Sequence, residues 1–136
     1  METRELTIET GHAGALVDLT ASCERFLVEL GASDGLLTVF VPHATAGVVV
    51  VELGAGSDDD LLRALADLLP RDDRWRHEHG SPGHGADHVL PLLASPSLTV
   101  PVVHGRMTLG TWQSIALLDP NRDNATRTVR LAYLAG

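Results

Sequence analysis

Four of the seven histidines of this chain lie between residues 77 and 88. Neutral imidazole is the commonest metal ligand in proteins, and it titrates near neutral pH. His84 and His88 are four residues apart and would share one face of a helix, whereas His77 and His79 would share a side only of an extended segment. The tract therefore predicts a metal-binding or proton-handling loop. A coincidence of composition is the alternative.

A fifth histidine adds a possible partner from another part of the chain. His43 follows an apolar run that ends at Pro42, so we expect it at the rim of a sheet, where loops gather. His43, His77 and His88 would offer three imidazoles and leave a fourth position open, as in catalytic zinc sites. Glu52 would lie near the same rim, as a base or as an outer partner of these ligands. Because no compact zinc motif is present, surface hydrogen bonding or helix capping stays open.

A second constellation surrounds Arg106, which follows Gly105 and precedes Gly110. Glycine lets a backbone approach a ligand closely, and a guanidinium grips phosphate or carboxylate through two hydrogen bonds. Trp112 would add an aromatic wall and Gln113 an amide. The alternative makes Trp112 a core residue and Arg106 a surface charge in a turn.

The composition limits the classes of function. With 136 residues, the chain is expected to form one domain over residues 1–136. A net charge of −8 argues against a nucleic-acid partner. No apolar run is long enough for a membrane span, and we expect no secretory leader. The single cysteine, Cys23, excludes an internal disulfide, suits the cytoplasm, and is expected to pack as a small apolar residue.

Two enzyme classes lack their motifs. No nucleophile elbow, phosphate-binding loop or dinucleotide glycine pattern is present, so a serine hydrolase and a hydride-transfer enzyme are not expected.

The elements that must position these residues can be predicted from periodicity and turn signals. Strands dominate both ends of the chain, helices lie between them, and there is no regular alternation of strand and helix. This pattern predicts an α+β domain with a largely antiparallel sheet and a few packed helices. We expect strands at 3–10, 15–19, 35–42, 47–51, 97–103, 107–118 and 126–134, a helix capped by Thr20 and closed by Gly31, a helix over 58–69, and a short helix ending near Pro91.

In order and spacing, these motifs resemble the YjbQ-like family, often named secondary thiamine-phosphate synthase. The resemblance covers essentially the whole chain, and no single element decides it. The His43-Ala-Thr-Ala element resembles the family's His-Thr-Ser-Ala, and Glu52 stands where the family has Asn-Glu. Trp75-Arg76-His77 resembles the family's Tyr-x-His, and Ala86-Asp87-His88 resembles its small-x-His. The family's C-terminal block is matched by Ser95–Val102, Gly105-Arg106 and Gly110–Gln113.

The resemblance implies a small α+β protein with a mostly antiparallel sheet, commonly a homotrimer with its site near subunit boundaries. It also implies a divalent ion, zinc, or magnesium with a diphosphate substrate. The associated activity is weak thiamine-phosphate synthesis, in which a pyrimidine diphosphate joins a thiazole phosphate and pyrophosphate is released. On this reading the metal ligands are His43, His77 and His88, the catalytic residues are Glu52 and Arg106, and the residues that contact a phosphorylated or anionic substrate are Arg76, His84, Thr111, Trp112 and Gln113.

The chain departs from the family pattern at its expected site. Leu53–Gly56 intervenes before Asp58, where the family usually carries an Asn and an Asp, and His84 stands where an acid or amide is usual. The substrate is therefore expected to differ in this branch. A non-catalytic metal-dependent trimer, a small-ligand-binding protein, and a metal-dependent enzyme acting on another metabolite are the alternatives.

Overall fold

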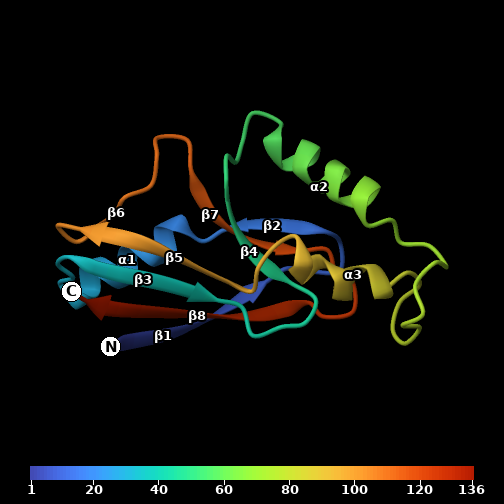
Figure 1. Ribbon diagram of the computed structural model, residues 1–136, viewed down its shortest axis with the longest axis horizontal. Helices are drawn as coiled ribbons and strands as arrows, with labels where there is room; N and C mark the ends of the chain where they lie inside the picture. The colour runs from blue at the N-terminus through green and yellow to red at the C-terminus, as the bar shows by residue number, and fades with distance from the viewer.

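Alternating apolar residues build two antiparallel sheets (Figure 1). The computed structural model describes residues 1–136. All strand pairs are antiparallel, which confirms the predicted α+β class. The five-stranded sheet has the order β1 (Glu2–Glu9), β8 (Thr126–Ala135), β3 (Gly35–Phe40), β5 (Ser97–Val103), β6 (Arg106–Met107), and the three-stranded sheet has the order β2 (Ala15–Asp18), β7 (Ser114–Asp119), β4 (Gly47–Val51).

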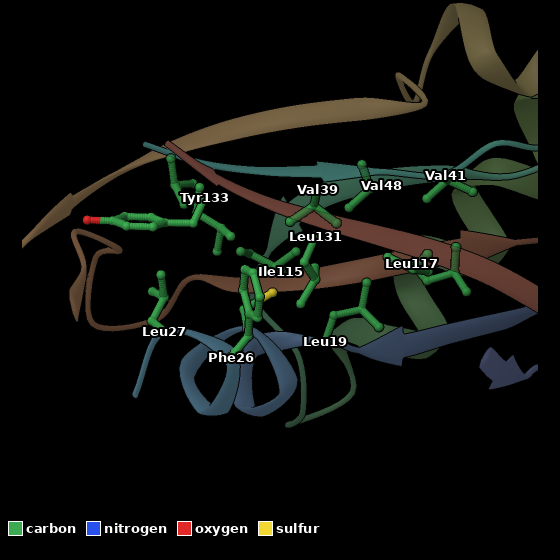
Figure 2. Packing of buried hydrophobic residues seen from close by; sticks show 14 of the residues in the cluster. Leu19, Phe26, Leu27, Val39, Val41, Val48, Ile115, Leu117, Leu131 and Tyr133 are labelled. Carbon is green, nitrogen blue, oxygen red and sulfur yellow. The ribbon is translucent and has the colours of Figure 1, made fainter. Parts of the chain in front are cut away.

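The main core lies between the two sheets and α1 (Thr20–Leu30), as Figure 2 shows. From β8, Val129, Leu131 and Tyr133 are buried alternately, as the alternation of apolar and polar residues in this strand predicts. Cys23 of α1 is fully buried, and burial raises the pKa of its thiol to about 12. A thiol that stays protonated at neutral pH is a packing residue and not a nucleophile.

Two predicted boundaries differ from the structure. Thr20 does not cap α1, because its hydroxyl instead accepts a hydrogen bond from the Ile115 backbone N–H (2.9 Å), and the N-cap is Leu19. The expected strand over 107–118 is two strands, β6 and β7, with a loop at 108–113 between them. In that loop, Gln113 Oε1 accepts a hydrogen bond from the Gly110 N–H (2.8 Å), which closes a turn where periodicity alone predicted an extended chain.

A second layer covers the other face of the three-stranded sheet. It consists of α2 (Ser57–Leu68), α3 (Gly85–Val89) and the single turn η1 (Leu90–Leu92), in which Pro91 marks the change to 3₁₀ geometry. Leu90, Ala94 and Leu118 form a small buried cluster there. No residue of α2 is fully buried, and Figure 1 shows α2 standing off from the strands, with the segment between α2 and α3 at the edge of the molecule. None of the helices is long and apolar enough to cross a lipid bilayer.

Candidate metal centre

The four histidines of the tract form one cluster. The candidate ligand atoms of His77, His79, His84 and His88 all lie within 4.8 Å of one another. His84 is the N-cap of α3, and His88 lies in that helix, so the spacing of four puts both rings on one face, as predicted. Their Nε2 atoms are 2.9 Å apart. His77 and His79 come from the exposed segment that precedes α3, with ring centroids 4.0 Å apart.

Arg71 fastens that segment to α3. Its guanidinium forms an ion pair with buried Asp87, and its Nη2 donates to Ser81 Oγ (2.7 Å). Gly85 allows a further close approach, because a Cβ there would lie 2.3 Å from the Cβ of Trp75. These contacts fold the chain back on itself and bring the two exposed imidazoles onto α3.

Asp123, from the loop between β7 and β8, orients His84. The Nδ1 of buried His84 lies 2.7 Å from Asp123 Oδ2. A proton on Nδ1 satisfies this carboxylate and leaves the Nε2 lone pair facing the other imidazoles. A carboxylate behind a histidine in this way fixes the tautomer and the ring orientation of metal-ligating histidines. The Ser81 N–H (3.1 Å) and hydroxyl (3.2 Å) also donate to Asp123. Asp123 therefore connects the loop between β7 and β8 with the segment that precedes α3.

The surroundings favour the neutral form of His77 and His88 and the charged form of Asp123. The pKa of His88 is lowered by burial first and then by His77, His84 and His79, and the pKa of His77 is lowered by desolvation and by its histidine neighbours. Although desolvation opposes it, hydrogen bonds from Ser81 and the nearby His84 hold the pKa of Asp123 below its usual range. A metal ion requires neutral imidazole, so this state is ready to bind one.

His43 lies outside the cluster, so the expected trio of His43, His77 and His88 does not form within the chain. Its Nε2 accepts a hydrogen bond from the Thr128 backbone N–H (2.9 Å) and is therefore already engaged. Burial and then the positive charge of Arg127 lower the pKa of His43. Arg127 itself grips Asp119 through two bonds (2.8 and 2.9 Å). His43 thus belongs to a structural polar network.

The second predicted constellation is also separate from the histidines. Arg106 lies on β6 and Trp112 in the 108–113 loop, and Figure 1 places β6 at the opposite end of the molecule from α3. Trp112 is 74% exposed, so it is not the core residue of the alternative prediction either. The other predicted contact residues, Glu52, Arg76, Thr111 and Gln113, are exposed. Of these four, only Arg76 adjoins a histidine of the cluster in sequence.

Sequence reasoning missed several residues that build the centre. It left His79 and His84 outside the proposed ligand set, with His84 predicted as a substrate contact, although a spacing of two from His77 to His79 and of four from His84 to His88 signalled shared faces. It also missed Asp123, Asp87 and Arg71. The segment from Asp119 to Asn124 was recognisable only as a turn, and nothing local indicates that its acid reaches His84, 39 positions earlier in the chain.

Comparison with known proteins establishes the kinship of the chain. The family described as "UPF0047 protein YjbQ-like" matches residues 4–136. The chain belongs to the YjbQ-like UPF0047 family. A UPF0047 protein of Mycobacterium tuberculosis is 55% identical over 136 residues, with all of both chains covered. A UPF0047 protein of Archaeoglobus fulgidus is 33% identical, over 92% of this chain and 96% of that protein.

Solved structures of YjbQ-like proteins share the fold. A hypothetical protein of Aeropyrum pernix has a TM-score of 0.91 at 34% identity, with all of both chains covered. An uncharacterized YjbQ/UPF0047 protein of Clostridium acetobutylicum has a TM-score of 0.87 at 26% identity, over 96% of this chain and 99% of that chain. The family is thus shown together with its α+β fold, while the function has to be argued from the histidine cluster.

Proposed function

We propose that this YjbQ-like protein binds a divalent transition-metal ion, with zinc as the first candidate, through His77, His79, His84 and His88. We further propose that the ion serves an enzyme acting on a small phosphorylated or anionic metabolite. The observation that carries the proposal is the convergence of four imidazoles within 4.8 Å, one of them backed by a carboxylate.

The donor set fits zinc better than magnesium. Zinc binds imidazole nitrogen at about 2.0–2.1 Å, which in a tetrahedron puts the ligand atoms about 3.3 Å apart. His84 and His88 are already at about this separation, at 2.9 Å, and the exposed segment bearing His77 and His79 needs only a small contraction. Magnesium prefers oxygen ligands, so the magnesium expected with a diphosphate substrate has no matching set here.

Two of the proposed metal ligands are exposed, as expected for a metal site that a substrate can reach. His77 and His79 are exposed, so solutes reach the cluster from that side. If one of the two exposed imidazoles gave up its place to substrate or water, a bound zinc ion would supply Lewis acidity, which polarises a phosphoryl or carbonyl oxygen or acidifies a bound water. Arg76, exposed and next to His77, would attract the negative charge of a substrate.

Thiamine-phosphate synthesis is the specific form of this proposal that the family resemblance supports. It asks for stabilisation of the negative charge on a departing pyrophosphate, which cationic groups supply. Arg106 would have to serve this site from a neighbouring subunit, because β6, which carries it, lies at the opposite end of the molecule from α3, and Glu52 lies outside the histidine cluster. This form of the proposal therefore includes the homotrimer, with its site at the subunit boundaries.

A non-catalytic metal-dependent assembly, or a protein that binds a small ligand without turnover, is the second candidate. Its supporting observation is that the cluster offers four imidazoles and not three. Four protein ligands close a tetrahedral shell, which is the arrangement of structural zinc sites.

The metal is tested by elemental analysis of tag-free protein purified without chelator. We expect about one zinc per chain, as for other sites of this kind. His88→Ala should lose most of the metal, whereas His104→Ala, at an exposed hairpin histidine outside the cluster, should keep it. Less than about one-tenth of an equivalent, not restored by added zinc, would contradict the proposal.

Removal of the metal then separates the two candidates. If light scattering shows that the chelated protein keeps its oligomeric mass but no longer releases pyrophosphate from the pyrimidine and thiazole substrates, the catalytic form is supported. If the assembly dissociates and neither form of the protein turns over substrate, the structural form is supported.

A further inference from the structure

A pocket of about 370 Å³ lies on the side of α2 that faces the loop between β7 and β8. Its apolar wall includes Leu62, Leu65 and Ala66 of α2. Its polar end carries Arg71, Asp87 and Arg122. None of the four clustered histidines lines it, so the pocket is distinct from the metal centre, although the Arg71–Asp87 pair adjoins both.

The charges at the polar end do not cancel. Asp87 is neutralised by its ion pair with Arg71, and it also accepts a hydrogen bond from Asn121 Nδ2 (3.1 Å). Arg122 is exposed and lines the pocket, and its guanidinium forms no ion pair or hydrogen bond with the protein, so it adds a positive charge that no direct partner neutralises. The Arg122 carbonyl accepts a hydrogen bond from His12 Nδ1 (2.9 Å), so the backbone that carries this charge is held in place.

A second donor at this end also lacks a partner. Arg71 Nε is the one buried side-chain nitrogen or oxygen of the chain without a hydrogen-bond partner. This atom is closed off from solvent, so an anion in the pocket would reach it only after the Arg71 side chain shifts. A free guanidinium at Arg122 beside an apolar wall is complementary to a molecule with an acidic head and an apolar body.

We propose that this pocket binds a small organic anion, a carboxylate or a phosphate monoester, with its apolar part against α2 and its charged head at Arg122 and Arg71. The net charge of −8 does not prevent this, because screening confines charge effects to about 8 Å at physiological salt.

A neighbouring groove provides an internal contrast. On the other side of α2, a groove of about 200 Å³ is lined by apolar residues alone, among them Leu68 and Leu93. With no charged or polar group, it has no means to select an anion over a neutral molecule. We therefore expect the pocket at Arg122 to prefer anions over neutral molecules and the apolar groove to show no such preference.

The test is an NMR titration with three probes, 4-phenylbutyrate, phenyl phosphate and the neutral 4-phenylbutanamide. Each is added to the protein as purified and after chelator treatment, and the amide signals of Gly14 and Ala66 report on the pocket. We expect saturable shifts at these amides with at least one anion, and binding of the neutral amide weaker by about tenfold or more, as for a hydrogen bond to a charged group. Comparison of the affinities for 4-phenylbutyrate and phenyl phosphate shows whether the pocket prefers a carboxylate or a phosphate.

A matched pair of variants assigns the effect to Arg122. Arg122→Glu should weaken binding of the anions by about tenfold or more and leave the neutral amide nearly unchanged. Arg63→Glu makes the same charge change at an exposed α2 residue that does not line the pocket, and it should leave all three affinities unchanged.

Equal affinity for the anions and the amide, or equal effects of the two variants, would overturn the proposal. So would shifts at Leu93 and Leu118 of the apolar groove in place of Gly14 and Ala66. Anion binding that disappears on chelation would assign the anion to the metal and also overturn it. Protein that holds no zinc but still binds the anion would contradict the metal centre alone, so the two proposals fail separately.

Discussion

Asp123 orients the imidazole of His84 for metal binding without being a metal ligand itself. Its carboxylate accepts a hydrogen bond from His84 Nδ1 (2.7 Å), and two hydrogen bonds from Ser81 favour its ionised form. The imidazole is thereby turned with Nε2 toward its neighbours before any ion arrives. At the scale of the residue, the centre depends on hydrogen bonds behind the ligands as much as on the ligands themselves.

Asp123→Asn should therefore lower zinc affinity. Loss of an outer-shell carboxylate typically costs about 10–100-fold in metal affinity. Competition with a chromophoric chelator measures the change. Asp72→Asn is the control, because Asp72 is an exposed acid of the segment before α3 that pairs with Arg74 and not with a histidine. Equal affinities of the two variants would show that Asp123 does not orient His84.

His43 should make the metal-free protein less stable as pH falls. Burial and Arg127 lower its pKa in the folded state, so the unfolded chain binds more protons between this lowered pKa and about 6.5. The free energy of unfolding therefore falls as pH drops from about 6.5 through the lowered value. His43→Gln retains an acceptor for the Thr128 N–H but does not titrate, so urea unfolding at several pH values should show a flatter dependence.

The matching control is His104→Gln, at an exposed residue of the β5–β6 hairpin. A slope that changes equally in the two variants would contradict the assignment to His43.

At the scale of elements, Gly47 sets how closely β4 passes the segment that follows η1. A Cβ at Gly47 would lie 2.3 Å from the backbone oxygen of Ala94. Gly47→Ala should force the strand and this segment apart, at a cost of about 1–3 kcal/mol for overpacking. Gly14→Ala is the control, because its added Cβ would meet no atom closer than 4.0 Å. Thermal unfolding of both variants measures the difference, and equal melting temperatures would contradict the close approach.

Sequence patterns predicted the elements that depend only on neighbouring residues, such as β8 and the end of α1. The alternation at Val129, Leu131 and Tyr133 predicted which side chains of β8 face the core, and Gly31, with φ 61°, ends α1 where the sequence indicated. The spacing of His84 and His88 gave half of the cluster. Periodicity could not show that a backbone N–H already occupies the Nε2 of His43. Nor could it show that a turn interrupts the chain at 108–113, where the Gln113 N–H donates to the Gly110 carbonyl (3.0 Å) and the Gln113 side chain accepts from the Gly110 N–H (2.8 Å).

At the scale of the whole molecule, the surface beside α2 is unusually apolar. Leu68 is 67%, Leu92 85% and Leu93 58% exposed, and Leu68 and Leu93 border the all-apolar groove. Large exposed apolar patches mark interaction sites in soluble proteins. A homotrimer would bury such a surface, in agreement with what the family resemblance implies.

Leu93→Asp should therefore convert a trimer into monomers, because a carboxylate would be buried at the contact without a partner. Light scattering coupled to size exclusion reports the mass. Val28→Asp introduces the same charge at an exposed apolar residue of α1, away from the groove, and should leave the mass unchanged. A monomeric wild-type protein, or a trimer that tolerates Leu93→Asp, would contradict the prediction.

The helix α2 is shared by the two cavities. It has no fully buried residue, whereas β7 is buried from Ile115 to Asp119. Leu65 borders both the proposed anion pocket and the apolar groove, so the two cavities have one wall in common. An occupant of either cavity that shifts this wall would change the other cavity, and such coupling is reciprocal by thermodynamic necessity. Subunit association and capture of a small anion would then report on each other through a single helix.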